Sequence, residues 1–179
     1  MLQRLNELDT SLTSRIRLKE GSGWWRLAAF LAHSGDSWLW AIAIALVWLF
    51  GRPHWRGYAA VLEISIVIQA LFVFALKGVF RRRRPEGDWG GIYRQFDPHS
   101  FPSGHATRAM LLTVLAITLG PAWFGALVAV WAPLVCLSRV LTGVHYLSDV
   151  LGGMVLGLGM GILMAAVSPI WPRILPFLF

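Results

Sequence analysis

Apolar residues along the chain gather in runs whose lengths match membrane helices. The clearest are Tyr58 to Phe80 and Leu147 to Val167, each near the roughly 20 residues that a crossing helix needs. Gly104 to Leu119 and Ala122 to Val140 predict two further helices, separated by a Gly-Pro turn. The pattern therefore predicts an all-α fold, a polytopic transmembrane helical bundle with five to six membrane helices.

The N-terminal part follows a different pattern. Apolar residues recur at three- and four-residue steps from Leu2 to Ile16, with arginines between them. This spacing predicts an amphipathic interfacial helix, although a short helix packed on the bundle fits it equally. Trp24 to Leu31 and Trp38 to Phe50 are apolar but short, so residues 23–51 form either one or two membrane helices. We expect residues 1–20 to form the N-terminal helix and residues 21–179 a single transmembrane domain.

Composition supports a membrane protein. Of 179 residues, 56% are hydrophobic and only 14% are charged, and the mean hydropathy is +0.61. Soluble domains are about 25% charged. The net charge of +7 fits basic loops beside anionic lipids or a pocket for an anionic substrate. Nucleic-acid binding is not expected, because no soluble basic domain is visible.

Residues suited to phosphate chemistry gather at the predicted helix ends. Lys77 lies near the end of the first long run, and Arg84 and Pro85 follow after six intervening residues. Such cations suit the C-terminal end of a helix dipole. They equally suit a phosphate clamp, with Lys77 as a point charge and Arg84 as a fork matched to phosphate oxygens. Arg83 and the two arginines before it are candidates for a second phosphate or for lipid headgroups.

A Pro-Ser-Gly-His turn precedes the predicted helix at residues 104–119. A helix start presents unpaired N–H groups and a positive potential, which attract anions. Gly104 lets a ligand approach the backbone, Ser103 can cap the helix or bond phosphate, and His105 can protonate a leaving oxygen. A capped helix with a satisfied histidine explains the same residues. Arg108, one turn further, is a candidate to reach the same pocket.

A third group consists of Ser138 and Arg139, then His145, then Asp149. His145 and Asp149 are four apart, so on a helix they would share a face. The carboxylate could then accept from one imidazole nitrogen and leave the other free to attack phosphorus. Ionisable groups among apolar neighbours are costly, which favours function over a structural pair.

These three groups resemble the signature of the type 2 phosphatidic acid phosphatase (PAP2) superfamily, which includes bacterial lipid phosphatases and vanadium haloperoxidases. That signature is Lys, six residues, Arg-Pro; then Pro-Ser-Gly-His; then Ser-Arg, five residues, His, three residues, Asp. Every position is present, at Lys77 to Pro85, Pro102 to His105 and Ser138 to Asp149. The resemblance covers about residues 37–168.

The resemblance implies a phosphatase that works through a phosphohistidine. His145 would be the nucleophile, Asp149 its orienting carboxylate, and His105 the general acid and later the base that activates water. The phosphate-binding residues that it implies are Lys77, Arg84, Ser103, Gly104 and Arg139. Neither a metal nor a cofactor is expected, because three cations and a helix terminus carry the charge stabilisation.

The implied substrate is a lipid phosphate or diphosphate, such as phosphatidic acid, phosphatidylglycerophosphate or undecaprenyl pyrophosphate. Vanadate-dependent halide oxidation is an alternative, as is a non-catalytic lipid-binding or transport protein of the same fold. The expected partners are the substrate and membrane lipids, and the oligomeric state is left open.

The expected location is a cell membrane of the bacterial inner-membrane type. The helix ends with the motifs carry eight Lys and Arg, the opposite ends three, and the N-terminal segment five. The positive-inside rule therefore depends on where the N-terminal segment lies. The family resemblance implies an extracytoplasmic site.

Overall fold

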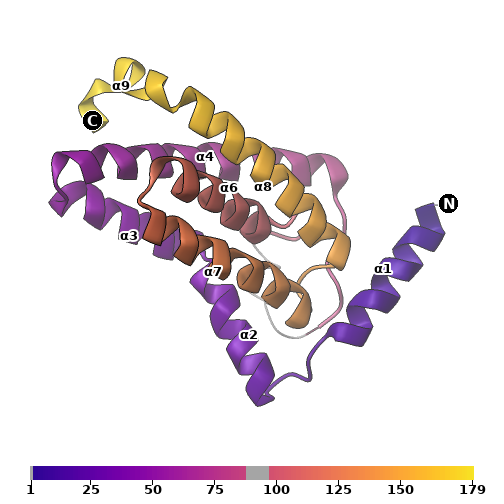
Figure 1. The fold of residues 1–179 in the computed structure, drawn as a ribbon. Helices are drawn as coiled ribbons and strands as arrows, with labels where there is room; N and C mark the ends of the chain where they lie inside the picture. Colours follow the sequence, from indigo (N-terminus) through magenta and orange to yellow (C-terminus); the bar gives the residue numbers. More distant parts are fainter. Residues whose placement is uncertain (1, 88–96) are drawn as a thin grey trace.

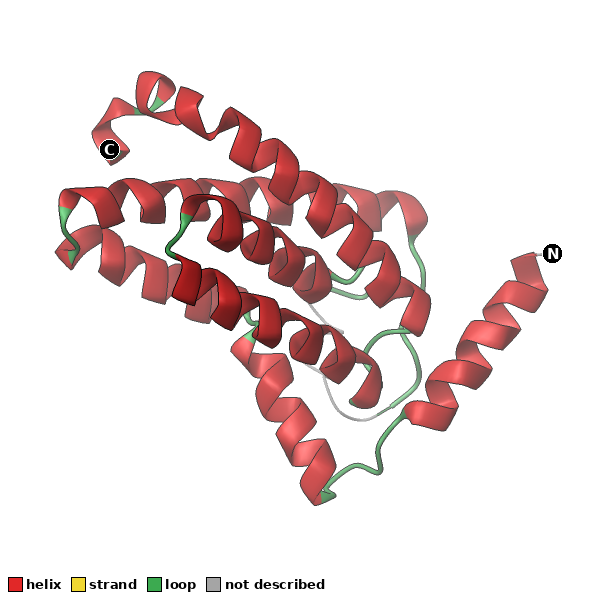
Figure 2. Ribbon diagram, in the orientation of Figure 1, coloured by secondary structure: helices red, strands yellow, loops and turns green. Residues whose placement is uncertain are grey.

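The computed structural model describes residues 2–87 and 97–179, and these form helices joined by loops (Figures 1 and 2). The helices are α1 (Leu2–Ile16), α2 (Gly23–Ser34), α3 (Ser37–Phe50), α4 (Pro53–Phe80), α6 (Gly104–Leu119), α7 (Ala122–Leu141), α8 (Leu147–Val167) and α9 (Trp171–Ile174). Two 3₁₀ helices, η1 (Ser168–Ile170) and η2 (Pro176–Leu178), flank α9. No strand occurs in the described ranges, so the all-α prediction is confirmed there.

The predicted helix bounds agree closely with the structure. α6 and α8 begin and end at the predicted residues, and α7 extends one residue further, to Leu141. α4 begins at Pro53 rather than at Tyr58. Its first turn is polar, so hydropathy alone missed it, but a proline suits the first turn of a helix because its φ is already helical.

The length and composition of the described helices do not confirm the predicted five to six membrane helices. Among the described residues, three are long and apolar enough: α4, α7, and the stretch Leu147–Ile174 that begins with α8. α2 and α3 pass the same test together but meet at a 48° bend, which would make a fourth span. α6 has only 16 residues. A length criterion therefore supports three or four spans.

α6 is the central helix of the bundle. It packs mainly against α8 and α7 (Figure 1), and residues on every face of it are buried. Gly153, Gly157 and Gly161, four residues apart on α8, face α6 so closely that an added Cβ would meet atoms of α6 or of its N-cap, Ser103, within 2.2–2.7 Å. The glycine-rich run thus makes the close helix contact that its composition predicts.

α1 docks on the end of the bundle that carries the three motifs. The hydroxyl of Thr13, a buried residue, accepts the N–H of Leu147 at 3.1 Å. Just after α1, the N–H of Leu18 donates to the carbonyl of Leu141 at 3.0 Å. The N-terminal segment therefore lies on the same side as the motifs, next to the α7–α8 loop.

Candidate active site

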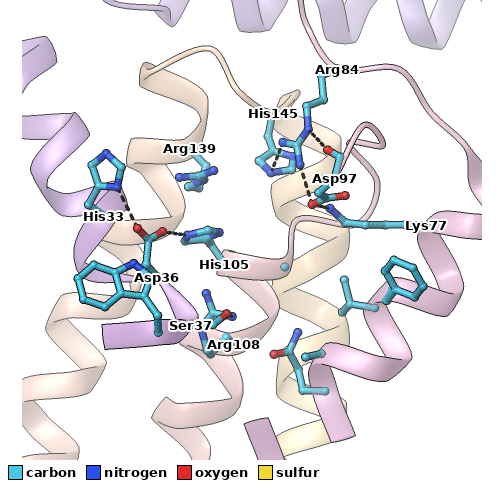
Figure 3. A pocket seen from close by; sticks show the side chains of 16 residues that line it. His33, Asp36, Ser37, Lys77, Arg84, Asp97, His105, Arg108, Arg139 and His145 are labelled. Carbon is cyan, nitrogen blue, oxygen red and sulfur yellow. Dashed lines mark hydrogen bonds and ion pairs between the residues drawn. The ribbon is translucent and has the colours of Figure 1, made fainter. Parts of the chain in front are cut away.

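The three motifs and the α2–α3 turn surround one cavity of about 700 Å³. Figure 3 shows its charged side chains converging from α2, α4, α6 and α7 and from the loops that follow α4 and α7. Its charged and histidine lining residues are His33, Asp36, Lys77, Arg84, Asp97, His105, Arg108, Arg139 and His145. The remaining lining is largely apolar, with Ala70, Val73 and Phe74 from α4. The cavity thus joins a cationic end to a wall suited to hydrocarbon.

Lys77 and Arg84, called here the cationic clamp, meet in this cavity. Both bond the same carboxylate oxygen, Oδ2 of Asp97; the Arg84 contact is 2.8 Å. Lys77 also donates to the carbonyl of His99 at 3.0 Å, and Arg84 to the carbonyl of Asp97 at 2.9 Å. The two cations of the clamp therefore bind one anion, the carboxylate of Asp97. The sequence patterns did not identify Asp97.

The ring of His145 is buried, and its two nitrogens face different groups. An N–H of Arg84 lies 3.1 Å from Nε2. Because a guanidinium donates and cannot accept, Nε2 carries the lone pair in this contact and the ring proton is on Nδ1. Burial, together with the charges of the cationic clamp and Arg139, holds the pKa of His145 well below its ordinary value. At neutral pH the imidazole is therefore neutral, with its lone pair directed at the clamp.

His145 and Asp149 face each other, although they do not share a helix. α8 begins at Leu147 with Tyr146 as its N-cap, so His145 belongs to the preceding loop. Oδ2 of Asp149 accepts the N–H of Tyr146 at 2.9 Å and lies 3.5 Å from Nδ1 of His145. The carboxylate caps its own helix and faces the protonated nitrogen at longer range, a looseness common in sites without substrate.

Arg82 links this carboxylate to α1. Its guanidinium donates to Oδ1 of Asp149 and to Oδ2 of Asp9, both at 2.7 Å. It also lies 4.2 Å above the ring of Tyr146. Arg82 therefore neutralises a fully buried carboxylate that would be costly to leave unpaired. The sequence did not predict this role of Arg82, because nothing in the run of four arginines distinguishes it from its neighbours.

The Pro-Ser-Gly-His turn is joined directly to α8. The N–H of Ser103 donates to the carbonyl of Asp149 at 3.0 Å, which fixes the start of α6 beside the start of α8. The Ser103 hydroxyl is buried, makes no cap bond, and has no hydrogen-bond partner within the described part of the chain. Gly104 lines the cavity at the N-terminus of α6. Both helices thus direct positive N-terminal ends towards the site.

His105, in the first turn of α6, lies in the same cavity, and its Nε2 is 2.7 Å from Oδ1 of Asp36. Asp36 also contacts His33, with Oδ2 at 2.9 Å from Nδ1. Neither residue belongs to a predicted motif. The stretch around Asp36 reads as a polar break between apolar runs, so sequence patterning marks it as a turn and nothing more.

This geometry agrees with comparisons to known proteins. Residues 58–172 match the profile of the PAP2 superfamily. The chain belongs to this superfamily.

Two curated relatives extend the likeness beyond the profile. An undecaprenyl-diphosphatase of Sulfolobus acidocaldarius is 33% identical over 135 residues, which covers 73% of this chain and 64% of that relative. A decaprenylphosphoryl-5-phosphoribose phosphatase of Mycobacterium tuberculosis is 32% identical over 165 residues, covering 90% of each protein. The chain is accordingly a phosphatase, a hydrolase of the PAP2 type.

Two solved structures share the fold. A transmembrane PAP2-type phosphatidylglycerolphosphate phosphatase from Bacillus subtilis superposes with a TM-score of 0.75 at 24% identity, covering 93% of this chain and 87% of that one. Aquifex aeolicus LpxE gives a TM-score of 0.68 at 22% identity, covering 87% and 93%. These likenesses, with the apolar helices, identify a membrane protein with the PAP2 fold.

Of the other residues predicted for the PAP2 site, two line the cavity and one does not. Arg139 is buried and lines the cavity. Arg108 also lines it, while its guanidinium donates to the carbonyl of Gly35 and, at 2.6 Å, to the hydroxyl of Ser37. Arg83 is exposed and does not line the cavity. Its backbone pairs with that of His99.

A metal ion would need several His, Cys, Asp or Glu side chains gathered around one point. Across residues 2–87 and 97–179, no group of three or more His, Cys, Asp or Glu side chains has a suitable arrangement. In the described part of the site, the groups suited to binding phosphate are the cations Lys77, Arg84 and Arg139 and the N–H groups at the start of α6.

Proposed function

We propose that this PAP2 protein hydrolyses a lipid phosphate or diphosphate through a phosphohistidine at His145. The observation that supports this most directly is the 3.1 Å contact between Arg84 and Nε2 of His145 inside the cavity. A lone pair held beside two cations is placed to attack phosphorus whose oxygens those cations bind. Lipid phosphates are the substrates because the cationic end continues into an apolar wall.

In the first half-reaction, the lone pair on Nε2 of His145 forms a bond to phosphorus as the bond to the leaving oxygen breaks. Protonated His105 gives a proton to that oxygen, and the lipid leaves as the alcohol or the lower phosphate. Asp149 stabilises the positive charge that develops on the imidazole.

In the second half-reaction, neutral His105 takes a proton from water as the water oxygen bonds to phosphorus. The P–N bond then breaks, inorganic phosphate leaves, and His145 returns to its neutral form while His105 is protonated again. Protons and bonds therefore balance over one turnover.

The phosphoryl oxygens are held by fixed charges. The groups that bind them are Lys77, Arg84, Arg139, the Ser103 hydroxyl and the Gly104 N–H. Preorganised donors of this kind stabilise a transferring phosphoryl group in the way that a metal ion would otherwise do. We therefore propose a metal-independent reaction, and activity should persist in EDTA.

The relatives favour a long isoprenoid lipid. The two relatives described above are named for undecaprenyl and decaprenyl phosphates. We propose a polyprenyl phosphate or diphosphate as the first substrate to test, with phosphatidic acid and phosphatidylglycerophosphate as competitors in the same panel.

We propose five to six membrane-embedded helices in one domain, residues 21–179, with residues 1–20 as an interfacial helix. α6 would lie in the membrane inside the bundle, where neighbours replace lipid on all sides, and α2 and α3 would count as one bent span or two. The exposed side chains of Leu8, Leu12 and Ile16 support membrane contact by α1.

For the orientation, we propose an extracytoplasmic site in a cell membrane of the bacterial inner-membrane type. With α1 at the motif end, the Lys and Arg count becomes 13 against three, although one of those 13, Arg94, lies outside the described residues. That count alone favours a cytoplasmic site. Several of these cations are paired with carboxylates, as Arg82 and Arg84 are. Their positive charge is then partly neutralised, so the count overstates the charge that would keep this end in the cytoplasm. Labelling a cysteine introduced at Arg83 with a membrane-impermeant reagent would decide.

The experiment for the activity is phosphate release from the lipid panel in detergent, with His145→Ala as the control. Release by the wild type and none by the variant is the expected result. Vanadate, which mimics a five-coordinate transition state, should inhibit. Equal activity in the variant would remove His145 from the mechanism. Lipid binding without release would favour a non-catalytic protein.

A further inference from the structure

Asp36 lies between two histidines, outside the three motifs. Its Oδ1 atom is 2.7 Å from Nε2 of His105, and its Oδ2 atom is 2.9 Å from Nδ1 of His33 (Figure 3). We propose that Asp36 is the positioning residue of His105, fixing its tautomer and orientation, and that His33 holds the second oxygen of the carboxylate. This deepens the proposed function and rests on it.

The Asp36 side chain contacts the two histidines and does not cap its own helix. Asp36 is the N-cap residue of α3, where an aspartate usually accepts an N–H of its own helix. Its side chain makes no such bond. Asp36 is also buried, so its charge needs partners in the protein. Both oxygens reach histidines instead, and one of these is the histidine at the start of α6.

The turn that carries Asp36 is held by the helix that carries His105. Arg108, three residues after His105 on α6, donates from Nε to the carbonyl of Gly35 at 3.2 Å and from Nη1 to the hydroxyl of Ser37 at 2.6 Å. A Cβ on Gly35 would lie 3.1 Å from Cδ2 of His105, so the turn passes close beside the ring. These contacts fix Asp36 relative to the imidazole from both sides of the turn.

The contact assigns separate tasks to the two ring nitrogens. With Nε2–H donating to Asp36, we assign the proton transfers to Nδ1, the other nitrogen of a ring that lines the cavity. In the first half-reaction, Nδ1–H of the imidazolium passes its proton to the leaving oxygen. In the second half-reaction, the Nδ1 lone pair takes a proton from water. The Nε2 proton stays with Asp36 throughout, so the carboxylate stabilises the imidazolium without itself being protonated.

Asp36→Asn tests this assignment, with two substrates that differ in the leaving group. An alkyl phosphate lipid needs a proton on its leaving oxygen, whereas a nitrophenyl phosphate does not. A positioned general acid contributes about 100-fold or more. We therefore expect kcat/KM on the alkyl substrate to fall about 100-fold and kcat/KM on the aryl substrate to fall less than about threefold. The ratio kcat/KM reports the first half-reaction, so hydrolysis of the phosphohistidine, which both substrates share, does not enter the comparison.

Two further variants serve as comparisons. Glu63→Gln makes the same carboxylate-to-amide change at a residue that lines a different, apolar cavity, and both substrates should retain wild-type rates. His33→Gln should give a smaller loss than Asp36→Asn on the alkyl substrate. The His33 side chain is 48% exposed, and its contact is with Oδ2 of Asp36, whereas His105 contacts Oδ1. Equal losses of kcat/KM on the two substrates in Asp36→Asn, or an unchanged kcat/KM on the alkyl substrate, would overturn the proposal.

The His145→Ala control separates this proposal from the proposed function. Wild-type phosphate release by that variant would refute the phosphohistidine while leaving the Asp36 comparison readable. ¹⁵N NMR of the histidine rings gives a readout that needs no turnover, with the His105 signal assigned by its loss in His105→Gln. We expect a protonated Nε2 in the wild type and a changed tautomer population in Asp36→Asn. An unchanged His105 signal in Asp36→Asn would refute the positioning role.

Discussion

Replacing Gly157 with alanine should separate α8 from α6 and so disturb the site. A Cβ at this position would lie 2.2 Å from the carbonyl oxygen of Thr107 and 2.9 Å from Cβ of Met110. Ordinary contact begins near 3.4 Å, so the helices would have to part by about 1.2 Å. The carbonyl belongs to a helix and cannot rotate away.

The expected magnitude follows from this geometry. Overpacking usually costs about 1–3 kcal/mol, and a clash with backbone belongs at the upper end. For a chain of this size each kcal/mol shifts Tm by about 2–4 °C, so Tm should fall by about 6–12 °C. Thr107 is two residues from His105, and a misplacement of about 1 Å can cost 100-fold in rate, so phosphate release should fall sharply.

Gly159→Ala is the matched control. Gly159 lies on the same helix, and a Cβ there would meet no atom within 4 Å. Its Tm should stay the same or rise slightly, because alanine is the better helix former by up to about 1 kcal/mol. Thermal unfolding in detergent, followed by the phosphate-release assay, measures both effects. Wild-type Tm and activity in Gly157→Ala, or equal losses in the two variants, would refute this account of the α6–α8 contact.

Three further outcomes follow from the site. Asp97→Ala removes the anion that occupies the cationic clamp, so inorganic phosphate and vanadate should inhibit about tenfold more strongly, a gain of about 1.4 kcal/mol in binding; weaker inhibition would mean that Asp97 orients the clamp. Arg82→Leu leaves the carboxylate of Asp149 buried without its cation, so kcat should fall about 100-fold with KM nearly constant; unchanged kinetics would contradict that role. His105→Ala should reduce kcat more than it weakens vanadate binding, whereas Arg139→Ala should weaken vanadate binding more, and isothermal binding with initial rates distinguishes them.

The fold was predictable where hydropathy and helix breakers agree. α6 and α8 were located to the residue because Gly120-Pro121 and the turn before Leu147 mark sharp boundaries. The bend between α2 and α3 was not resolved by sequence, because a polar break between short apolar runs fits either one span or two. The spacing of His145 and Asp149 suggested a pair on one helix face, and the two side chains do face each other, but across the helix start that Tyr146 caps.

The candidate site was predictable as far as the motifs extend. The structure brings Lys77, Arg84, His105 and His145 into one cavity, as their order in the motifs predicts. The residues that were missed act through partners distant in sequence. Asp36 is 69 residues from His105, and no periodicity connects residues so far apart. Such pairings depend on how helices are arranged in three dimensions, which a single sequence does not reveal.

The contact between α1 and Arg82 has a practical consequence for protein production. The guanidinium of Arg82 donates to both Asp9 and Asp149. Ser148, beside Asp149, donates its N–H to Asp9 at 3.1 Å. A shortened gene that starts at residue 21 would encode every motif yet delete one of the anions around Arg82. A shortened protein should therefore keep α1, which carries Asp9.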